Sequence, residues 1–131
     1  ANAREVTNTA FNLSAGWVLT GEDSGYNGVS PKTRFNPSAG TWGAFEVVGR
    51  IAMVDIDDAA FAGGAGSLAA PGTNAGGVTG YGLGLNWYLS KSVRANFDLF
   101  ENTFRFQGAR PAGGVLSSDE TAFISRLQVS F

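Results

Sequence analysis

Apolar and polar residues alternate along five separate stretches of this chain. In residues 6–20 the apolar parity consists of Phe11, Leu13, Ala15, Trp17 and Leu19. Successive side chains of a strand point to opposite faces of its sheet, so this period of two predicts a strand with one apolar face. The same period recurs in residues 42–56, 78–89, 93–104 and 123–131. The sequence therefore predicts an all-β fold.

The predicted strands are longer than most strands of globular proteins. A globular strand usually has about 5–6 residues, whereas a strand that crosses a bilayer needs ~9–11. The last stretch places Phe123, Leu127, Val129 and Phe131 on one parity, so its final residue is an aromatic one. Aromatic rings near strand ends suit the boundary between hydrocarbon and water. Strand length and this final ring together favour an antiparallel transmembrane β-barrel.

Residues 78–89 contain the sharpest interior pattern, because Gly80, Gly82 and Gly84 alternate with bulky apolar residues. Glycine tracks weaken a strand in a packed soluble core. In a barrel, lipid would hold the outer face while the glycines keep the inner wall clear. We therefore expect an open inner wall along this strand.

The connections between the strands test the barrel topology. Outer-membrane barrels have short periplasmic turns, long outer loops and a last strand that descends to the periplasm. Connections 57–77 and 105–120 are then outer loops, and 90–92 is a periplasmic turn. The Gly, Pro, Asn and Ser residues of 21–40 also predict a loop, but it falls on the periplasmic side and is too long for a simple turn.

Composition excludes several classes of function. Cys and His are absent, which excludes a disulfide framework, a Cys/His zinc site and His- or Cys-based catalysis. The net charge of −2 excludes a generally basic nucleic-acid binder. Asp55, Asp57 and Asp58 lack the spacing and closing Glu of an EF-hand, so a flexible loop is favoured over a Ca²⁺ site. We expect no enzyme activity, no metal and no cofactor.

Charged residues make up 15% of the chain, below the ~25% usual in soluble proteins. No run of about 18 apolar residues exists, so no transmembrane helix is predicted. Residues 1–5 contain no apolar segment of a signal peptide, so an export signal would have been removed or would lie upstream.

The polar parities of the predicted strands carry seven candidate pore-lining residues: Glu46, Arg50, Arg94, Asn96, Asp98, Arg126 and Gln128. An Arg facing lipid near the bilayer midplane would cost ~2–4 kcal/mol, so we assign this parity to the barrel interior. Guanidinium groups stay charged and offer planar donors to oxyanions, which suits an anion pore. A structural interpretation stays open, because Glu46 lies four residues from Arg50, and Asp98 four residues from Arg94.

Four aromatic residues of outward parity are candidates for a girdle at the membrane interface: Trp17, Tyr81, Trp87 and Phe131. The alternative is ordinary core packing in a soluble, secreted β-sandwich. The outward faces would then be buried against a second sheet.

Four stretches of the chain resemble the phosphate-selective porin O and P family of Gram-negative outer membranes. They are GWVLTGE at 16–22, GAFEVVGR at 43–50, LGLNWYL at 83–89 and RLQVSF at 126–131. In order and spacing they are similar to the C-terminal third of such a porin. The resemblance implies a 16-stranded barrel, usually trimeric, that passes small anions. It also implies that the segment after the T-G-E is extended.

Five strands cannot close a 16-stranded barrel, and open edges in lipid would leave backbone groups unsatisfied at several kcal/mol each. We therefore expect residues 1–131 to be the C-terminal portion of one barrel domain, with a split barrel as the alternative. Leu127, Val129 and Phe131 also resemble the C-terminal signal that the barrel assembly machinery recognises.

The sequence thus predicts a lipid-embedded outer-membrane porin for passive diffusion of small solutes, with anions such as phosphate implied by the resemblance. The alternative function is a structural or partner-docking barrel in an envelope assembly.

Overall fold

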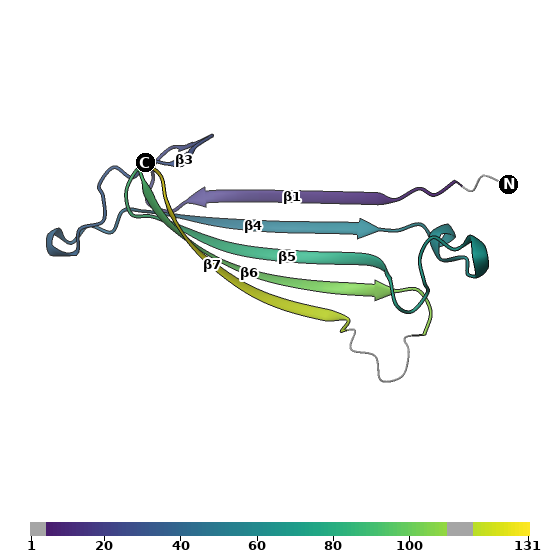
Figure 1. The fold of residues 1–131 in the computed structure, drawn as a ribbon. Helices are drawn as coiled ribbons and strands as arrows, with labels where there is room; N and C mark the ends of the chain where they lie inside the picture. The colour runs from purple at the N-terminus through teal and green to yellow at the C-terminus, as the bar shows by residue number, and fades with distance from the viewer. Residues whose placement is uncertain (1–4, 110–116) are drawn as a thin grey trace. The chain divides into compact units, whose positions relative to one another are not determined.

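The computed structural model describes residues 5–109 and 117–131, and five long strands in these ranges form one sheet. Residues 1–4 and part of the predicted 105–120 loop lie outside the described residues. The strands are β1 (Thr9–Val18), β4 (Ala44–Asp55), β5 (Ala75–Tyr88), β6 (Val93–Phe106) and β7 (Asp119–Val129). They are neighbours in chain order, as Figure 1 shows. The predicted all-β fold is confirmed.

Contacts between strands show an antiparallel arrangement. Where β5 turns into β6, the Leu89 N–H donates to the Val93 carbonyl oxygen at 3.0 Å. Farther from this turn, a Cβ on Gly80 would lie 2.6 Å from the Asn102 side chain, so the two strands run in opposite directions. No helix among the described residues is long and apolar enough to cross a membrane.

The last long strand begins four residues before the stretch that the sequence predicts. Its ladder with β6 is extended there by a hydrogen bond from the Phe104 N–H to the Ser118 carbonyl oxygen at 2.7 Å. The Thr103 hydroxyl also donates to Asp119 at 3.2 Å. Polar side chains thus continue β7 beyond its apolar pattern, which begins at Phe123.

Backbone contacts divide the chain into two compact units, and each long strand contributes to both. Unit 1 comprises residues 1–13, 51–81 and 101–121. Unit 2 comprises residues 14–50, 82–100 and 122–131.

Unit 1 contains the 57–77 connection. Two short 3-10 helices form there, η2 (Asp58–Phe61) and η3 (Gly64–Gly66), and Ala60 and Phe61 are buried. Asp57 caps η2, because its carboxylate accepts hydrogen bonds from the N–H groups of Thr7 and Ala59, each at 2.8 Å. These bonds, that from Thr7 first, hold the pKa of Asp57 below its usual range.

Unit 2 contains the 21–40 connection, which is not the plain loop that the sequence predicts. It forms a two-stranded hairpin of β2 (Ser24–Gly25) and β3 (Gly28–Val29), followed by the 3-10 helix η1 (Pro37–Ala39). Val29 is buried against Ala44 and Tyr88, with Val18 packed beside them. This small cluster fixes the hairpin at the end of the sheet where the C-terminus also lies (Figure 1).

The faces of the sheet differ in chemistry as the alternation predicts. In unit 2, the Glu46 carboxylate hydrogen-bonds to side chains of even-numbered residues of β5. On the other face the ring of Phe45 stacks on that of Trp87, with centroids 5.7 Å apart. The apolar face is largely uncovered among the described residues, since Trp17 is 74% exposed and Leu83 60% exposed.

Candidate functional site

A carboxylate on the polar face of unit 2 joins neighbouring strands. Glu46 Oε2 accepts hydrogen bonds from Asn86 Nδ2 at 2.9 Å and from the Tyr88 hydroxyl at 2.8 Å. Asn86 Oδ1 in turn accepts a hydrogen bond from Asn96 Nδ2. Asn96 is only 8% exposed, and its Oδ1 is without a hydrogen-bond partner in the described part of the chain. Polar side chains thus tie β4, β5 and β6 together, and the two donors compensate the partly buried charge.

Arg94 forms a second cross-strand contact on the same face. Its Nε and Nη2 donate to Gln128 Oε1 on β7 at 3.1 and 2.8 Å. The structural interpretation of the sequence paired Arg94 with Asp98, but residues four apart on a strand are ~13 Å apart, whereas cross-strand neighbours are about 5 Å apart. Arg94 therefore bonds to a neutral amide, and no carboxylate of a described residue forms an ion pair with it.

The glycine track of β5 does not leave a clear inner wall, which corrects the expectation from the sequence. In unit 2, a Cβ on Gly84 would lie 2.5 Å from Asp98 Oδ1, and a Cβ on Gly82 would lie 2.9 Å from the Phe100 ring. The side chains of β6 therefore lean across β5 into the space that the glycines leave. The glycines admit neighbouring side chains rather than open space.

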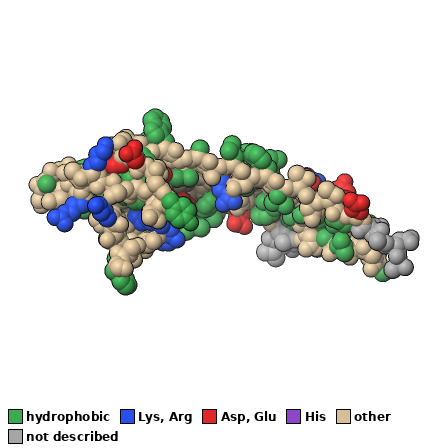
Figure 2. All heavy atoms as spheres, turned by 90° about the horizontal axis from the view of Figure 1, so that it is seen from above, with side chains coloured by type: hydrophobic (Ala, Val, Ile, Leu, Met, Phe, Trp, Pro, Cys, Tyr) green, Lys and Arg blue, Asp and Glu red, His purple; other side chains and the backbone are tan. Residues whose placement is uncertain are grey.

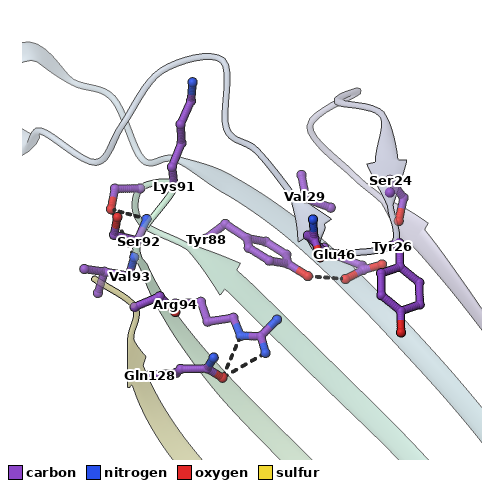
Figure 3. A pocket seen from close by; sticks show the side chains of 15 residues that line it. Ser24, Tyr26, Val29, Glu46, Tyr88, Lys91, Ser92, Val93, Arg94 and Gln128 are labelled. Atoms are coloured by element: carbon purple, nitrogen blue, oxygen red, sulfur yellow. Dashed lines mark hydrogen bonds between the residues drawn. The ribbon is translucent and has the colours of Figure 1, made fainter.

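A cavity of about 680 Å³ lies between the β2–β3 hairpin, the 90–92 turn and the end of β7. Figure 3 shows Tyr88, Glu46, Arg94 and Gln128 on the strands beneath the hairpin, with Lys91 extending from the turn. The cavity is lined mainly by polar groups, including the serines of the turn, Ser90 and Ser92. Its charged side chains are two cations and one carboxylate, so the lining is an electropositive, hydrogen-bonding surface.

The turn of the hairpin lies directly on this polar surface. Gly28 has a φ of +95°, and a Cβ there would be 3.2 Å from the Tyr88 hydroxyl and 3.5 Å from Arg94 Nη1. Only glycine allows this close approach at no steric cost. The hairpin backbone therefore lies against both Tyr88 and Arg94 at this point of the polar face.

The seven candidate residues on the polar parities have different surroundings in the structure. Glu46, Arg94 and Gln128 line the cavity. Asn96 and Asp98 lie on the same face, through contacts with Asn86 and Gly84. Arg50 and Arg126 share this parity, and both are exposed. The structure thus brings three of the seven together at one end of the strands, in one cavity.

Sequence reasoning missed several residues that line this cavity. Tyr88 shares the parity of Gly80, Gly82 and Gly84 in the predicted strand 78–89, but parity alone does not single it out. Val29 and Gly28 fall in the connection that the sequence predicts to be a loop. Lys91 was read as part of a turn. The one signal in the sequence was the excessive length of 21–40 for its expected position.

The aromatic candidates for an interface girdle lie on the apolar parity, but at different depths. Trp17 and Trp87 lie near the ends of β1 and β5, Phe131 follows β7, and Tyr81 lies midway along β5. Two further aromatic residues were not among these candidates, Phe35 in the connection and Trp42, which the sequence predicts as the first residue of the strand 42–56 but which precedes β4. The Phe35 ring meets Trp87 edge-on at 5.2 Å and Trp42 at 5.6 Å, and Trp87 Nε1 donates to the Trp42 carbonyl oxygen at 2.6 Å.

Basic side chains are concentrated in unit 2. It carries six basic residues, Lys32, Arg34, Arg50, Lys91, Arg94 and Arg126, against four acidic residues. Figure 2 shows several of these blue side chains around the connection at the left. The unit that holds the cavity is therefore positive, although the whole chain has a net charge of −2.

Comparison with known proteins identifies one family. The family model described as phosphate-selective porin O and P matches residues 1–131, which is the whole sequence. No curated protein and no solved structure matches the chain significantly. The resemblance carried by the four sequence stretches is confirmed by this match.

Proposed function

Because this chain belongs to the phosphate-selective porin O and P family, we propose that it forms part of an outer-membrane channel through which small anions diffuse. The members of such a family are channels rather than enzymes. The observation that carries the proposal is the cavity on the polar face, where Arg94 and Lys91 stand without a paired carboxylate among the described residues.

The two faces of the sheet support a membrane location. The apolar parity presents large exposed side chains such as Trp17, Leu83 and Leu127, which would face lipid. The polar parity presents hydrogen-bonded and charged groups, which would face water. An outer-membrane barrel needs both properties in alternation along every strand.

A larger barrel would satisfy the edges of the sheet. β1 and β7 each have one neighbour in the described sheet, so each leaves a row of backbone groups for another strand. We propose that residues 1–131 contribute five strands to a single barrel domain of 16 strands. Trimer formation, and recognition of Leu127, Val129 and Phe131 by the barrel assembly machinery, belong to the same proposal.

Arginines would guide the anion along the polar face. Arg94 is fixed by Gln128 with Nη1 still available, and Arg50 and Arg126 share its parity on two other strands. Guanidinium groups remain charged at any working pH and offer donors to oxyanions. The acids Glu46 and Asp98 keep the face from being uniformly positive.

The reversal potential of the full-length protein in a planar bilayer tests this proposal. Under a KCl gradient we expect anion preference, and Arg94→Gln should reduce the anion-to-cation permeability ratio about two- to fivefold, as expected for a group worth ~0.5–1 kcal/mol. Arg105→Gln is the matched control, because its guanidinium is paired with Asp55 at 2.7 Å in unit 1. Cation preference, or no channel, would contradict the proposal and favour a structural or docking barrel.

A further inference from the structure

Two phenylalanine rings lie on the parity of β6 that elsewhere carries mainly polar side chains. Phe104 and Phe106 share this parity with Asn102 in unit 1, and both rings are half-buried. Together they line a cavity of about 460 Å³. Small-molecule sites commonly have volumes of ~300–1,000 Å³ and combine aromatic walls with a few polar groups. The cavity therefore has the size and the apolar surface of a ligand site.

The polar part of this cavity carries negative charge. Asp119 and Glu120 line it, and no Lys or Arg is present among its described lining residues. The carboxylate of Asp119 accepts hydrogen bonds from the hydroxyls of Thr103 at 3.2 Å and Ser118 at 2.8 Å, which hold it without neutralising it. Glu120 is exposed, and no ion pair joins it to another described residue. The lining thus combines two aromatic rings with two carboxylates.

A further part of the lining comes from the segment that leads into β5. The Thr73 hydroxyl donates to the carbonyl oxygen of Ala70 at 3.3 Å, and Asn74 Oδ1 accepts from the N–H of Ala70 at 2.9 Å. The Gly72 N–H also donates to the carbonyl oxygen of Gln107, directly after β6, at 2.6 Å. These bonds hold the segment in place beside the end of β6, so this part of the lining is fixed by the protein itself.

The charge of unit 1 favours a cationic ligand. Seven of its described residues are acidic and only Arg105 is basic, and Arg105 is paired with Asp55 at 2.7 Å. An anion would be repelled by carboxylates in such surroundings. Hard metal cations take about six or more oxygen ligands, and the two rings supply none. An organic ammonium ion matches both parts of the lining, because its charge suits the carboxylates and its apolar groups suit the negative ring faces.

We propose that this cavity binds a small organic ammonium ion, with the rings of Phe104 and Phe106 against its apolar groups and the carboxylate of Glu120 facing its charge. A cation within ~6 Å of a ring centroid is attracted to the ring face, and the attraction grows when water is excluded. Because the rings are half-buried, we expect the positive charge to raise affinity roughly tenfold over an uncharged ligand of the same shape. The site goes beyond the proposed anion channel and does not depend on it.

Equilibrium binding of choline to the full-length protein, in micelles of an uncharged detergent, tests the proposal. The uncharged isostere of choline, 3,3-dimethylbutan-1-ol, should bind roughly tenfold more weakly in titration calorimetry. Equal affinities of the two ligands, or no saturable binding of choline, would overturn the proposal. Because calorimetry measures binding and not conduction, neither outcome bears on the anion channel, which the reversal potential tests separately.

Two variants assign the binding to this cavity. Phe104→Leu removes a ring face but keeps an apolar side chain, and Glu120→Gln removes the charge of an exposed side chain. Each should weaken choline binding about three- to fivefold and leave binding of the uncharged isostere within about twofold. Phe97→Leu and Glu101→Gln make the same changes on the other parity of β6 and should leave both affinities unchanged.

Binding of the isostere separates a binding defect from a folding defect, because the isostere needs the cavity but not its charge. If Phe104→Leu loses both ligands, Glu120→Gln still decides, because its exposed side chain forms no ion pair with another described residue. Choline binding that stays at the wild-type level in Glu120→Gln, or that falls equally in the two controls, would overturn the proposal.

Discussion

At the scale of single residues, what the polar face can bind at this end depends on which side-chain atoms already form hydrogen bonds within the protein. Glu46 uses one oxygen for structure, and Arg94 uses two of its three nitrogens for Gln128. Arg94 is held in place and still directs Nη1 toward the hairpin, whereas Glu46 Oε1 lies toward β1, 3.1 Å from the Cβ position of Gly16. The backbone of Gly28 lies against the same groups, so a single methyl group there would alter the arrangement.

Gly28→Ala should detach the hairpin from the polar surface. A Cβ at Gly28 would meet the Tyr88 ring at 3.1 Å, and its φ of +95° is unfavourable for Ala. We expect a strain of ~1–3 kcal/mol, faster amide exchange across 24–29 and a higher single-channel conductance.

Gly25 provides the control within the same hairpin, since it is the register partner of Gly28. A Cβ at Gly25 would meet its nearest neighbour at an ordinary 3.8 Å. Gly25→Ala should therefore leave exchange and conductance close to wild type. Equal effects of the two substitutions would show that the close approach of Gly28 has no role.

At the scale of elements, the 21–40 connection contacts both faces of the sheet at one end. Its hairpin packs on the polar face through Val29, whereas the Phe35 ring packs on Trp87 on the apolar face and Trp42 packs on Phe35. The connection rejoins β4 through Gly43, which lies against the backbone of Tyr88. The connection thus contacts both faces at the strand ends, at a position where the barrel topology predicts only a short turn.

Gly43→Ala should destabilise the protein by at least ~2 kcal/mol. A Cβ there would collide with the Tyr88 carbonyl oxygen, and the φ of +77° adds strain that backbone cannot easily relieve. Gly49 on β4 has open space around its Cβ position, so Gly49→Ala should be neutral or stabilising by ~0.4–1 kcal/mol. Urea midpoints of the two variants in lipid vesicles test the contrast, and similar midpoints would contradict it.

The five long strands were predictable because each contains a stretch with a period of two, from Phe11 to Leu19 in the first case. The cross-strand partners were not predictable from the same pattern. Parity shows that Glu46 and Tyr88 share a face, but only the register of β4 against β5 brings them into contact. The hairpin was missed because β2 and β3 have two residues each, too few for any periodicity. The glycine track was misjudged because its occupants, Asp98 and Phe100, belong to the next strand.

At the scale of the whole molecule, the polar and apolar faces of the sheet suit different surroundings, water for one and lipid for the other. The charged groups of the polar face lie among hydrogen-bonding partners, whereas the apolar face exposes aromatic and aliphatic side chains across all five long strands. Family membership gives this asymmetry its meaning, since a porin must present one face to lipid and the other to water.

Leu83→Arg should cost ~2–4 kcal/mol in a bilayer, because Leu83 is 60% exposed on the apolar parity near the middle of β5. Ser14→Arg makes the same addition on the exposed polar parity of β1 and should cost far less. Unfolding free energies in vesicles measure both. A soluble β-sandwich is the model that would be favoured if Leu83→Arg proved harmless and the protein stayed soluble without detergent.

The enclosure of the strand ends also sets an order for folding. Val29 packs against Ala44 and Tyr88, which both follow it in the chain and belong to two different strands. The hairpin therefore has no surface to dock on until β4 and β5 have paired. Phe35 likewise has no ring to pack on until β5 is in place, because its partner Trp87 is on β5. In the proposed channel, we therefore expect the hairpin to dock after β4 and β5 have paired, and the cavity beneath it to be more open in a partly folded barrel than in the mature one.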